Sequence, residues 1–160
     1  EDISAIYRLK WRLFAEAPFR NPPETEIFDL LRRARNVAIV GLSADRSRPS
    51  HGVARSLQKF GYRIIPVNPS ADSILGEPCV PTLAAAVAAL PAGERIDIVD
   101  VLRRPEHVSA IVDECIALHL PALWLQDGVI DEAAARRART ADVFTVMDRC
   151  IFRDRAALPT

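Results

Sequence analysis

The chain has 160 residues, 49% of them hydrophobic and 26% charged, a composition that predicts one globular domain with an apolar core. Its 21 basic and 21 acidic residues balance, so it lacks the overall positive charge that non-specific binding to nucleic acid or anionic membranes needs. No apolar stretch reaches the ~20 residues of a membrane span and no secretory leader opens the sequence, which favours a cytoplasmic protein. The cysteines lack metal-ligand spacing, so we expect reduced thiols and no metal site.

An N-terminal helical arm is expected over residues 1–22. Apolar residues recur at helical spacing from Ile3 to Phe14, and prolines then interrupt the pattern. The remaining residues, 23–160, are expected to form one domain that opens with a helix from about Pro23 to Ala34.

Short runs rich in valine and isoleucine then alternate with segments of amphipathic helical periodicity. The expected strands are 37–40, 63–67, 96–102, 122–125 and 143–147, and the expected helices are 50–60, 82–90, 105–118 and 131–139. Gly61 is a candidate C-cap of the first of these helices. The alternation predicts an α/β fold: a Rossmann-like, doubly wound parallel sheet of about five principal strands between two layers of helices. Ligands of such sheets bind beyond the carboxyl ends of the strands, where the strand order reverses.

The loop after the first strand combines several features that bind an anion. It contains a glycine that permits a tight turn, two serine hydroxyls, two arginines and the free backbone amides at the start of a helix. These residues are Gly41, Ser43, Arg46, Arg48 and Ser50. The alternative is that Ser50 only caps the helix and that the arginines are solvated.

Two common nucleotide motifs do not fit this loop. A dinucleotide fingerprint needs three closely spaced glycines, whereas only Gly41 and Gly52 are present, and Asn68 stands where an acidic residue is expected. A Walker loop needs a lysine, and none lies between Lys10 and Lys59. The pattern therefore disfavours both NAD and ATP hydrolysis.

The next two strand ends carry polar residues with two interpretations each. Asn68 precedes Pro69, which keeps it extended and able to contact an adenine or ribose, although Asn-Pro more often marks only a turn. Arg103 and Arg104 follow the third strand at the entrance of a helix, where they either bind an anion or solubilise the surface.

The last two strand ends offer an amide and a thiol. Gln126 and Gly128 follow the fourth strand, after Trp124, which we expect in the core. Cys150 follows the fifth strand beside Arg149 and is a candidate redox thiol, although free cysteines are more often inert.

Six segments stand in the same order as segments of one known family and extend over most of the chain, from about Thr25 to Cys150. They are residues 37–43, 48–54, 65–69, 103–105, 124–129 and 147–150. On these segments the chain resembles the small bacterial CoA-binding protein family, a stand-alone form of the CoA-binding Rossmann domain at the start of the succinyl-CoA synthetase α subunit.

The resemblance implies coenzyme A as the ligand and a role for each loop. The implied contacts are Gly41, Leu42, Ser43, Ser50 and Gly52 by the phosphates; Asn68 and Pro69 by the nucleotide; Val101, Leu102 and Arg103 along the ligand; and Gln126 and Gly128 by the adenine or pantetheine. We expect the phosphate-binding arginines to be among Arg46, Arg48, Arg103 and Arg104.

The expected function is therefore binding of CoA or acyl-CoA without a complete catalytic site. The synthetase also has a domain with a phosphorylated histidine and an ATP-binding partner subunit, and this chain has room for neither. His51, His107 and His119 do not supply a substitute. The alternatives are an NAD(P)-linked oxidoreductase and a regulatory module whose arm binds a second copy or another protein.

Overall fold

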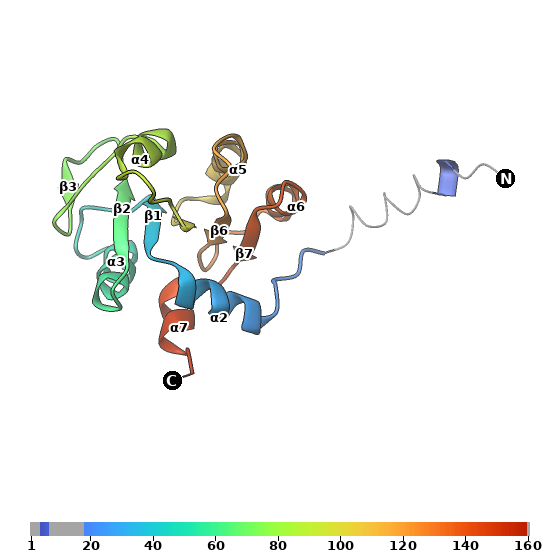
Figure 1. The fold of residues 1–160 in the computed structure, drawn as a ribbon, viewed down its shortest axis with the longest axis horizontal. Coiled ribbons are helices and arrows are strands. Elements are labelled where there is room, and N and C mark those ends of the chain that lie inside the picture. Colours follow the sequence, from blue (N-terminus) through green and yellow to red (C-terminus); the bar gives the residue numbers. More distant parts are fainter. Residues whose placement is uncertain (1–3, 7–17, 160) are drawn as a thin grey trace.

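The computed structural model describes residues 4–6 and 18–159, in which five parallel strands form the sheet that the sequence predicts (Figure 1). Their order is β2-β1-β5-β6-β7. The strands are β1 (Asn36–Val40), β2 (Arg63–Val67), β5 (Ile98–Val101), β6 (Ala122–Leu125) and β7 (Phe144–Met147). Their short, valine- and isoleucine-rich sequences suit strands that are covered on both faces.

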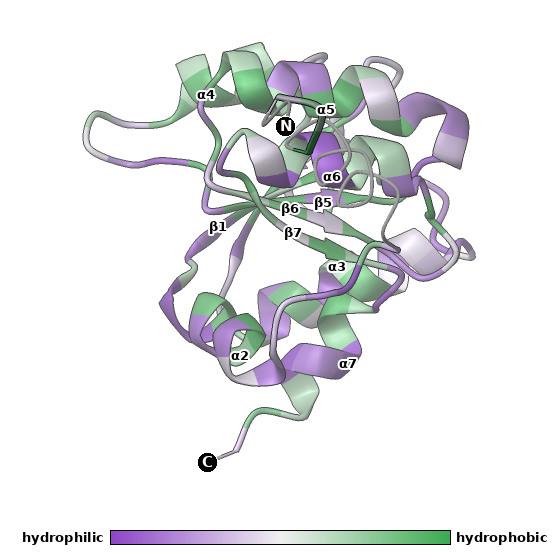
Figure 2. Cartoon of the chain, turned by 90° about the vertical axis from the view of Figure 1, so that its right-hand side faces the viewer, coloured by the Kyte–Doolittle hydropathy of each residue, from purple (hydrophilic) through white to green (hydrophobic). Residues whose placement is uncertain are grey.

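Helices cover both faces of the sheet (Figure 2). One face packs against α4 (Leu83–Ala89), α5 (Val108–Ala117) and α6 (Glu132–Thr140), and the other against α2 (Glu24–Arg33), α3 (Pro49–Lys59) and α7 (Ile151–Ala156). Successive side chains of a strand point to opposite faces, so Val99 and Val101 belong to the first core cluster and Ile98 to the second. This confirms the three-layer, Rossmann-like fold.

Three short elements were not expected from the sequence. An antiparallel hairpin of β3 (Ser73–Ile74) and β4 (Glu77–Pro78) follows β2, and α7 follows the last strand of the sheet. A 3₁₀ turn, η1 (Pro105–His107), precedes α5 within the segment predicted as one helix. Elements of two to six residues are too short to show a periodicity, and their formation depends on contacts with the rest of the domain.

Gly61 ends α3 as predicted, one residue past Phe60, which is the C-cap. Gly61 has a φ of +99°. Its N–H donates to the carbonyl of Gln58 at 2.9 Å, and the N–H of Tyr62 donates to the carbonyl of Leu57 at 3.1 Å. This is the Schellman arrangement, in which a glycine takes the left-handed conformation without a Cβ penalty.

The segment before α2 is attached to the sheet edge. The Asn21 carboxamide donates to the Met147 carbonyl at 2.9 Å and accepts from the Met147 N–H at 2.7 Å. Residues 4–6 are helical, whereas the rest of the helix expected from Ile3 to Phe14 lies outside the described residues. Within the described part of the chain, none of the helices combines the length and apolar character that crossing a membrane requires.

Candidate functional site

The sheet reverses its winding between two central strands. β1 pairs with β2 on one side and with β5 on the other, and all three are parallel. The loops that follow β1 and β5 therefore leave the same edge of the sheet in different directions. A crevice between such loops is the usual ligand position in a doubly wound sheet.

A groove of about 740 Å³ lies at this edge, between the loops that follow β1, β5 and β6. It brings together most of the predicted site residues. Those that line it are Gly41, Ser43, Arg48, Ser50, Leu102, Arg103, Arg104, Gln126 and Gly128. The volume falls in the ~300–1,000 Å³ range of small-molecule sites.

Gly41 allows two of these loops to meet. Its φ is +90°, and a Cβ at this position would lie 2.7 Å from the Leu102 carbonyl oxygen and 2.7 Å from Cδ of Arg103. A backbone oxygen cannot move away as a flexible side chain can. Only glycine fits here, and its backbone therefore forms part of the groove wall.

The groove has an excess of positive charge. Arg48 reaches its neighbour Asp45 only at 3.9 Å, with both side chains exposed, and Arg103 contacts Nε2 of His107 at 3.1 Å. The acidic residue on the groove wall, Asp127, forms an ion pair with Arg153 of α7. Guanidinium groups without strong internal partners are well suited to bind phosphate.

One interpretation of the sequence was that Ser50 only caps α3. The structure shows that this interpretation is wrong. The N-cap is Arg48, and within the described residues no side chain caps that end of the helix. The Ser50 hydroxyl instead accepts from the Ser43 N–H at 3.2 Å. This bond links the start of α3 to the preceding loop and holds both serines on the groove wall.

Several predicted residues do not line the groove. Leu42 and Val101 are buried in the core. The Asn68 carboxamide donates to the Leu42 carbonyl at 3.0 Å and accepts from the Ser70 N–H at 2.7 Å, so it connects the loops after β1 and β2. Pro69 is exposed, and Gly52 lies within α3. Arg46 lines a separate pocket.

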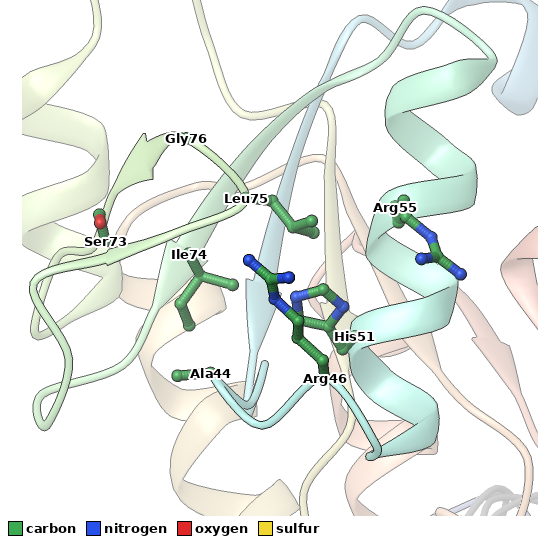
Figure 3. A pocket seen from close by; sticks show the side chains of 8 residues that line it. All are labelled: Ala44, Arg46, His51, Arg55, Ser73, Ile74, Leu75 and Gly76. Atoms are coloured by element: carbon green, nitrogen blue, oxygen red, sulfur yellow. The ribbon is translucent and has the colours of Figure 1, made fainter.

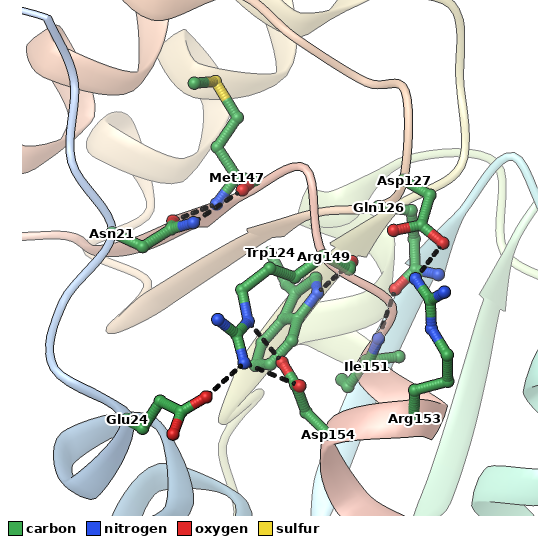
Figure 4. Close-up of polar contacts among 10 residues, drawn as sticks. All are labelled: Asn21, Glu24, Trp124, Gln126, Asp127, Met147, Arg149, Ile151, Arg153 and Asp154. Atoms are coloured by element: carbon green, nitrogen blue, oxygen red, sulfur yellow. Dashed lines mark hydrogen bonds and ion pairs between the residues drawn. The ribbon is translucent and has the colours of Figure 1, made fainter.

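Gln126 lines the groove and also supports the fold. It is buried, and its Oε1 accepts from the Ile151 N–H at 2.9 Å, at the start of α7 (Figure 4). Trp124 is fully buried, as predicted, and its Nε1 donates to the Arg149 carbonyl at 2.8 Å. Both side chains fix the segment that joins β7 to α7.

Arg149 binds carboxylates of two helices. Its guanidinium donates to both oxygens of Asp154 at 2.7 and 2.8 Å and to Glu24 at 3.3 Å (Figure 4). The hydrogen bonds that Arg149 donates to Asp154, above all, raise the pKa of Arg149. Cys150 is half-buried directly before α7, and the redox role of its thiol stays a prediction.

His107 also belongs to the groove, although the sequence pattern placed it only at a helix opening. It lies on the groove wall, where its Nε2 contacts the Arg103 guanidinium at 3.1 Å; Arg103 precedes the 3₁₀ turn, so helical spacing gave no signal for this pair. Among the described residues, His, Cys, Asp and Glu side chains form no group of three or more that could hold a metal ion.

The parallel, doubly wound sheet with a basic groove at its switch point defines a Rossmann-type ligand-binding domain. Residues 35–155 match the family described as CoA binding domain, and the chain therefore belongs to that family. This confirms the family expected from the six sequence segments.

Relatives cover nearly the same length. The chain is 36% identical over 132 residues to the uncharacterized protein YneT of Bacillus subtilis, a match that covers 82% of this chain and 93% of YneT. The solved structure of cell-free ID.343 from Thermus thermophilus is 32% identical, with a TM-score of 0.77, and the match covers 86% of this chain and 100% of that one. A hypothetical protein from Pyrococcus horikoshii OT3 is 26% identical, with a TM-score of 0.77 and coverage of 89% and 98%.

Proposed function

We propose that this protein binds coenzyme A, or a CoA thioester, in the groove beyond β1, β5 and β6, and that it acts as a binding protein without catalysing a reaction. The observation that carries the proposal is the basic groove at the switch point of a domain from the CoA binding domain family. CoA presents a diphosphate and a 3′-phosphate, and both suit arginine side chains.

The groove offers two kinds of phosphate donor. Arg48 lies at the start of α3, where free backbone amides and the helix dipole favour an anion. Arg103 and Arg104 enter from the opposite wall, after β5. Gly41 lets the Leu102 carbonyl and the Arg103 side chain pack against its backbone, which brings these two walls close enough to contact one ligand.

The chemistry of the described groove residues supports a binding role. A nucleophilic serine must donate its hydroxyl proton to a neighbouring base, and among the described residues neither Ser43 nor Ser50 donates to a His, Asp or Glu side chain. His107 contacts Arg103, and Asp127 is paired with Arg153, so neither contacts a groove serine. No pair of a nucleophile and a base is formed among these residues.

Thermal unfolding with added CoA tests the proposal. A ligand at 100 times its Kd stabilises the folded state by about 2.7 kcal/mol, so saturating CoA should raise the melting temperature by several degrees, and NAD at the same concentration should not. If NAD stabilises the protein and CoA does not, the proposal is wrong and the oxidoreductase alternative is favoured. Native mass spectrometry of the protein as purified would identify the CoA thioester that it carries.

A further inference from the structure

A second pocket, of about 410 Å³, lies on the other side of the loop that follows β1 (Figure 3). That loop, α3 and the β3–β4 hairpin form its walls. Arg46, His51 and Arg55 supply its basic groups, and Ile74 and Leu75 at the hairpin supply apolar surface. We call it the Arg46–His51 pocket.

His51 is a largely buried residue on the pocket wall, and its charge interacts with the carboxylate of Asp45 in the neighbouring loop. Its exposed fraction is 6%, and its imidazole forms no hydrogen bond with the described residues. Figure 3 shows the ring beside the guanidinium of Arg46 and close to Leu75. Since the ring nitrogens of His51 are not among the buried polar atoms that lack a partner, they remain accessible on the pocket wall, where an N–H can donate to a bound anion.

The two arginines of the pocket are also without partners. Neither Arg46 nor Arg55 forms an ion pair within the described part of the chain. Arg55 follows His51 by four residues in α3, which places both on one face of that helix. The nearby acid, Asp45, accepts from the N–H and hydroxyl of Ser47. The pocket wall itself contains no acidic residue among those described.

The walls of the pocket are fixed before any ligand binds. Ile74 is buried, and the Gln58 side chain donates to the Leu75 carbonyl at 3.0 Å, which attaches the hairpin to α3. The backbone and the apolar wall of the pocket therefore need little reordering when a ligand binds, whereas the exposed side chains of Arg46 and Arg55 would be ordered by it.

One loop separates this pocket from the groove. Ser43, Arg48 and Ser50 line the groove, whereas Arg46 and His51 line the pocket. A ligand that carries two separate phosphate groups could therefore place one on each side of the loop. CoA is such a ligand, since its 3′-phosphate is a monoester on the ribose, apart from the diphosphate.

We infer that the Arg46–His51 pocket binds a phosphate monoester, and that this group is the 3′-phosphate of bound CoA. The inference rests on the proposed function for the identity of the ligand. The guanidinium of Arg46 and an N–H of His51 donate to the terminal phosphate oxygens, and Arg55 adds positive charge at the pocket mouth.

Calorimetric titration with CoA and with dephospho-CoA tests the inference, because the two ligands differ only in the 3′-phosphate. The proteins are the wild type, Arg46→Ala, His51→Gln, Arg48→Ala in the groove, and Arg33→Ala as an exposed arginine of α2 away from both sites. Circular dichroism melting checks that each variant is folded. Inorganic phosphate serves as a separate probe of the pocket.

We expect the wild type and Arg33→Ala to bind CoA at least tenfold more tightly than dephospho-CoA. Arg46→Ala should lose tenfold to a hundredfold in CoA affinity with dephospho-CoA affinity unchanged, the range of one charge-assisted contact. Arg48→Ala should lower the affinity for CoA and the affinity for dephospho-CoA by the same factor. His51→Gln should reduce the preference in the same direction as Arg46→Ala.

Three outcomes would overturn the inference. Equal binding of CoA and dephospho-CoA by the wild type removes it and leaves the proposed function intact. Binding of neither ligand removes both. The third outcome is that inorganic phosphate binds the wild type but not Arg46→Ala, while that variant still prefers CoA over dephospho-CoA as the wild type does. The pocket would then belong to a separate phosphate compound.

Discussion

The carbonyl oxygen of Leu102 lies 2.7 Å from the position that a Cβ on Gly41 would occupy. The same two loops are joined by a hydrogen bond from the Leu102 N–H to the Val40 carbonyl at 2.9 Å. The floor of the groove is thus made by backbone from β1 and β5 in direct contact. This relationship makes Gly41 a structural residue as well as a candidate ligand contact.

Replacing Gly41 with alanine should destabilise the protein. The residue would be forced to keep a φ of +90° and its Cβ would collide with a carbonyl oxygen. The left-handed conformation alone costs about 1–2 kcal/mol, and the collision adds to it. Gly52→Ala is the matched control: a Cβ there meets nothing within 4 Å in α3, so it should stabilise by about 0.5–1 kcal/mol. Urea unfolding measures both, and equal stabilities would contradict the expectation.

The three arginines of the groove should contribute unequally to CoA binding. Arg48 and Arg104 lack a strong internal partner, whereas Arg103 already contacts His107. Replacing a phosphate-binding arginine with alanine should lower the affinity for CoA tenfold to a hundredfold. We expect Arg48→Ala to have such an effect in calorimetry and Arg33→Ala to have none. If alanine variants of Arg48, Arg103 and Arg104 all bind CoA with wild-type affinity, these arginines do not bind its phosphates.

Asp100 should make stability depend on pH. It is fully buried in the centre of β5, and neither carboxylate oxygen has a hydrogen-bond partner. Burial raises the pKa of Asp100 well above its ordinary value of 3.8. The native carboxyl therefore keeps its proton over a pH range in which the unfolded one releases it. Its contribution to stability is complete below pH 3.8 and falls as the pH rises toward the native pKa.

Asp100→Asn removes this titration while keeping the side-chain shape. The free energy of unfolding of the variant should increase relative to the wild type as the pH rises from 4 toward 8, by up to about 1.4 kcal/mol per pH unit. Urea unfolding at several pH values gives the difference between the two proteins, in which the other titrating groups cancel. A difference that stays constant across this range would show that the carboxyl does not titrate differently on unfolding.

Gln126 should matter for stability even though it lines the groove. Removing its side chain leaves the buried Ile151 N–H, at the start of α7, without an acceptor. An unsatisfied buried donor costs about 1–3 kcal/mol, so Gln126→Ala should lower the urea midpoint. Asp127→Ala is the neighbouring control, since its pair with Arg153 is exposed and is worth at most about 1 kcal/mol. If both variants unfold alike, the hydrogen bond to α7 contributes little.

The cysteines should differ in their reactivity. Cys115 is fully buried, and burial, with a smaller effect of Glu114, raises its pKa to about 12. Cys150 is only half-buried, so alkylation of the folded protein should label it before Cys115. Incubation with CoA disulfide then tests the redox role: a CoA-sized mass adduct that disappears in Cys150→Ser would support it, and an unmodified wild type would reject it.

The sequence by itself determined the sheet, its five strands and the loops that would carry the site. Those features depend on local signals: a run of valine and isoleucine, a helical period, a glycine at a strand end. Parallel strands place their carboxyl ends at one edge of a sheet. For that reason the strand pattern placed residues as distant as Gly41, Arg103 and Gln126 at one edge of the sheet, and the family resemblance assigned them to one ligand.

Only the tertiary structure decided what each loop residue does. Arg46 and Arg48 are two positions apart, yet one lines the pocket and the other the groove. Asn68 uses its carboxamide on the Leu42 carbonyl and the Ser70 N–H, and β5 buries Asp100 without a partner. Loop direction and hydrogen-bond partners are set by packing between segments far apart in the chain, which a local pattern does not encode.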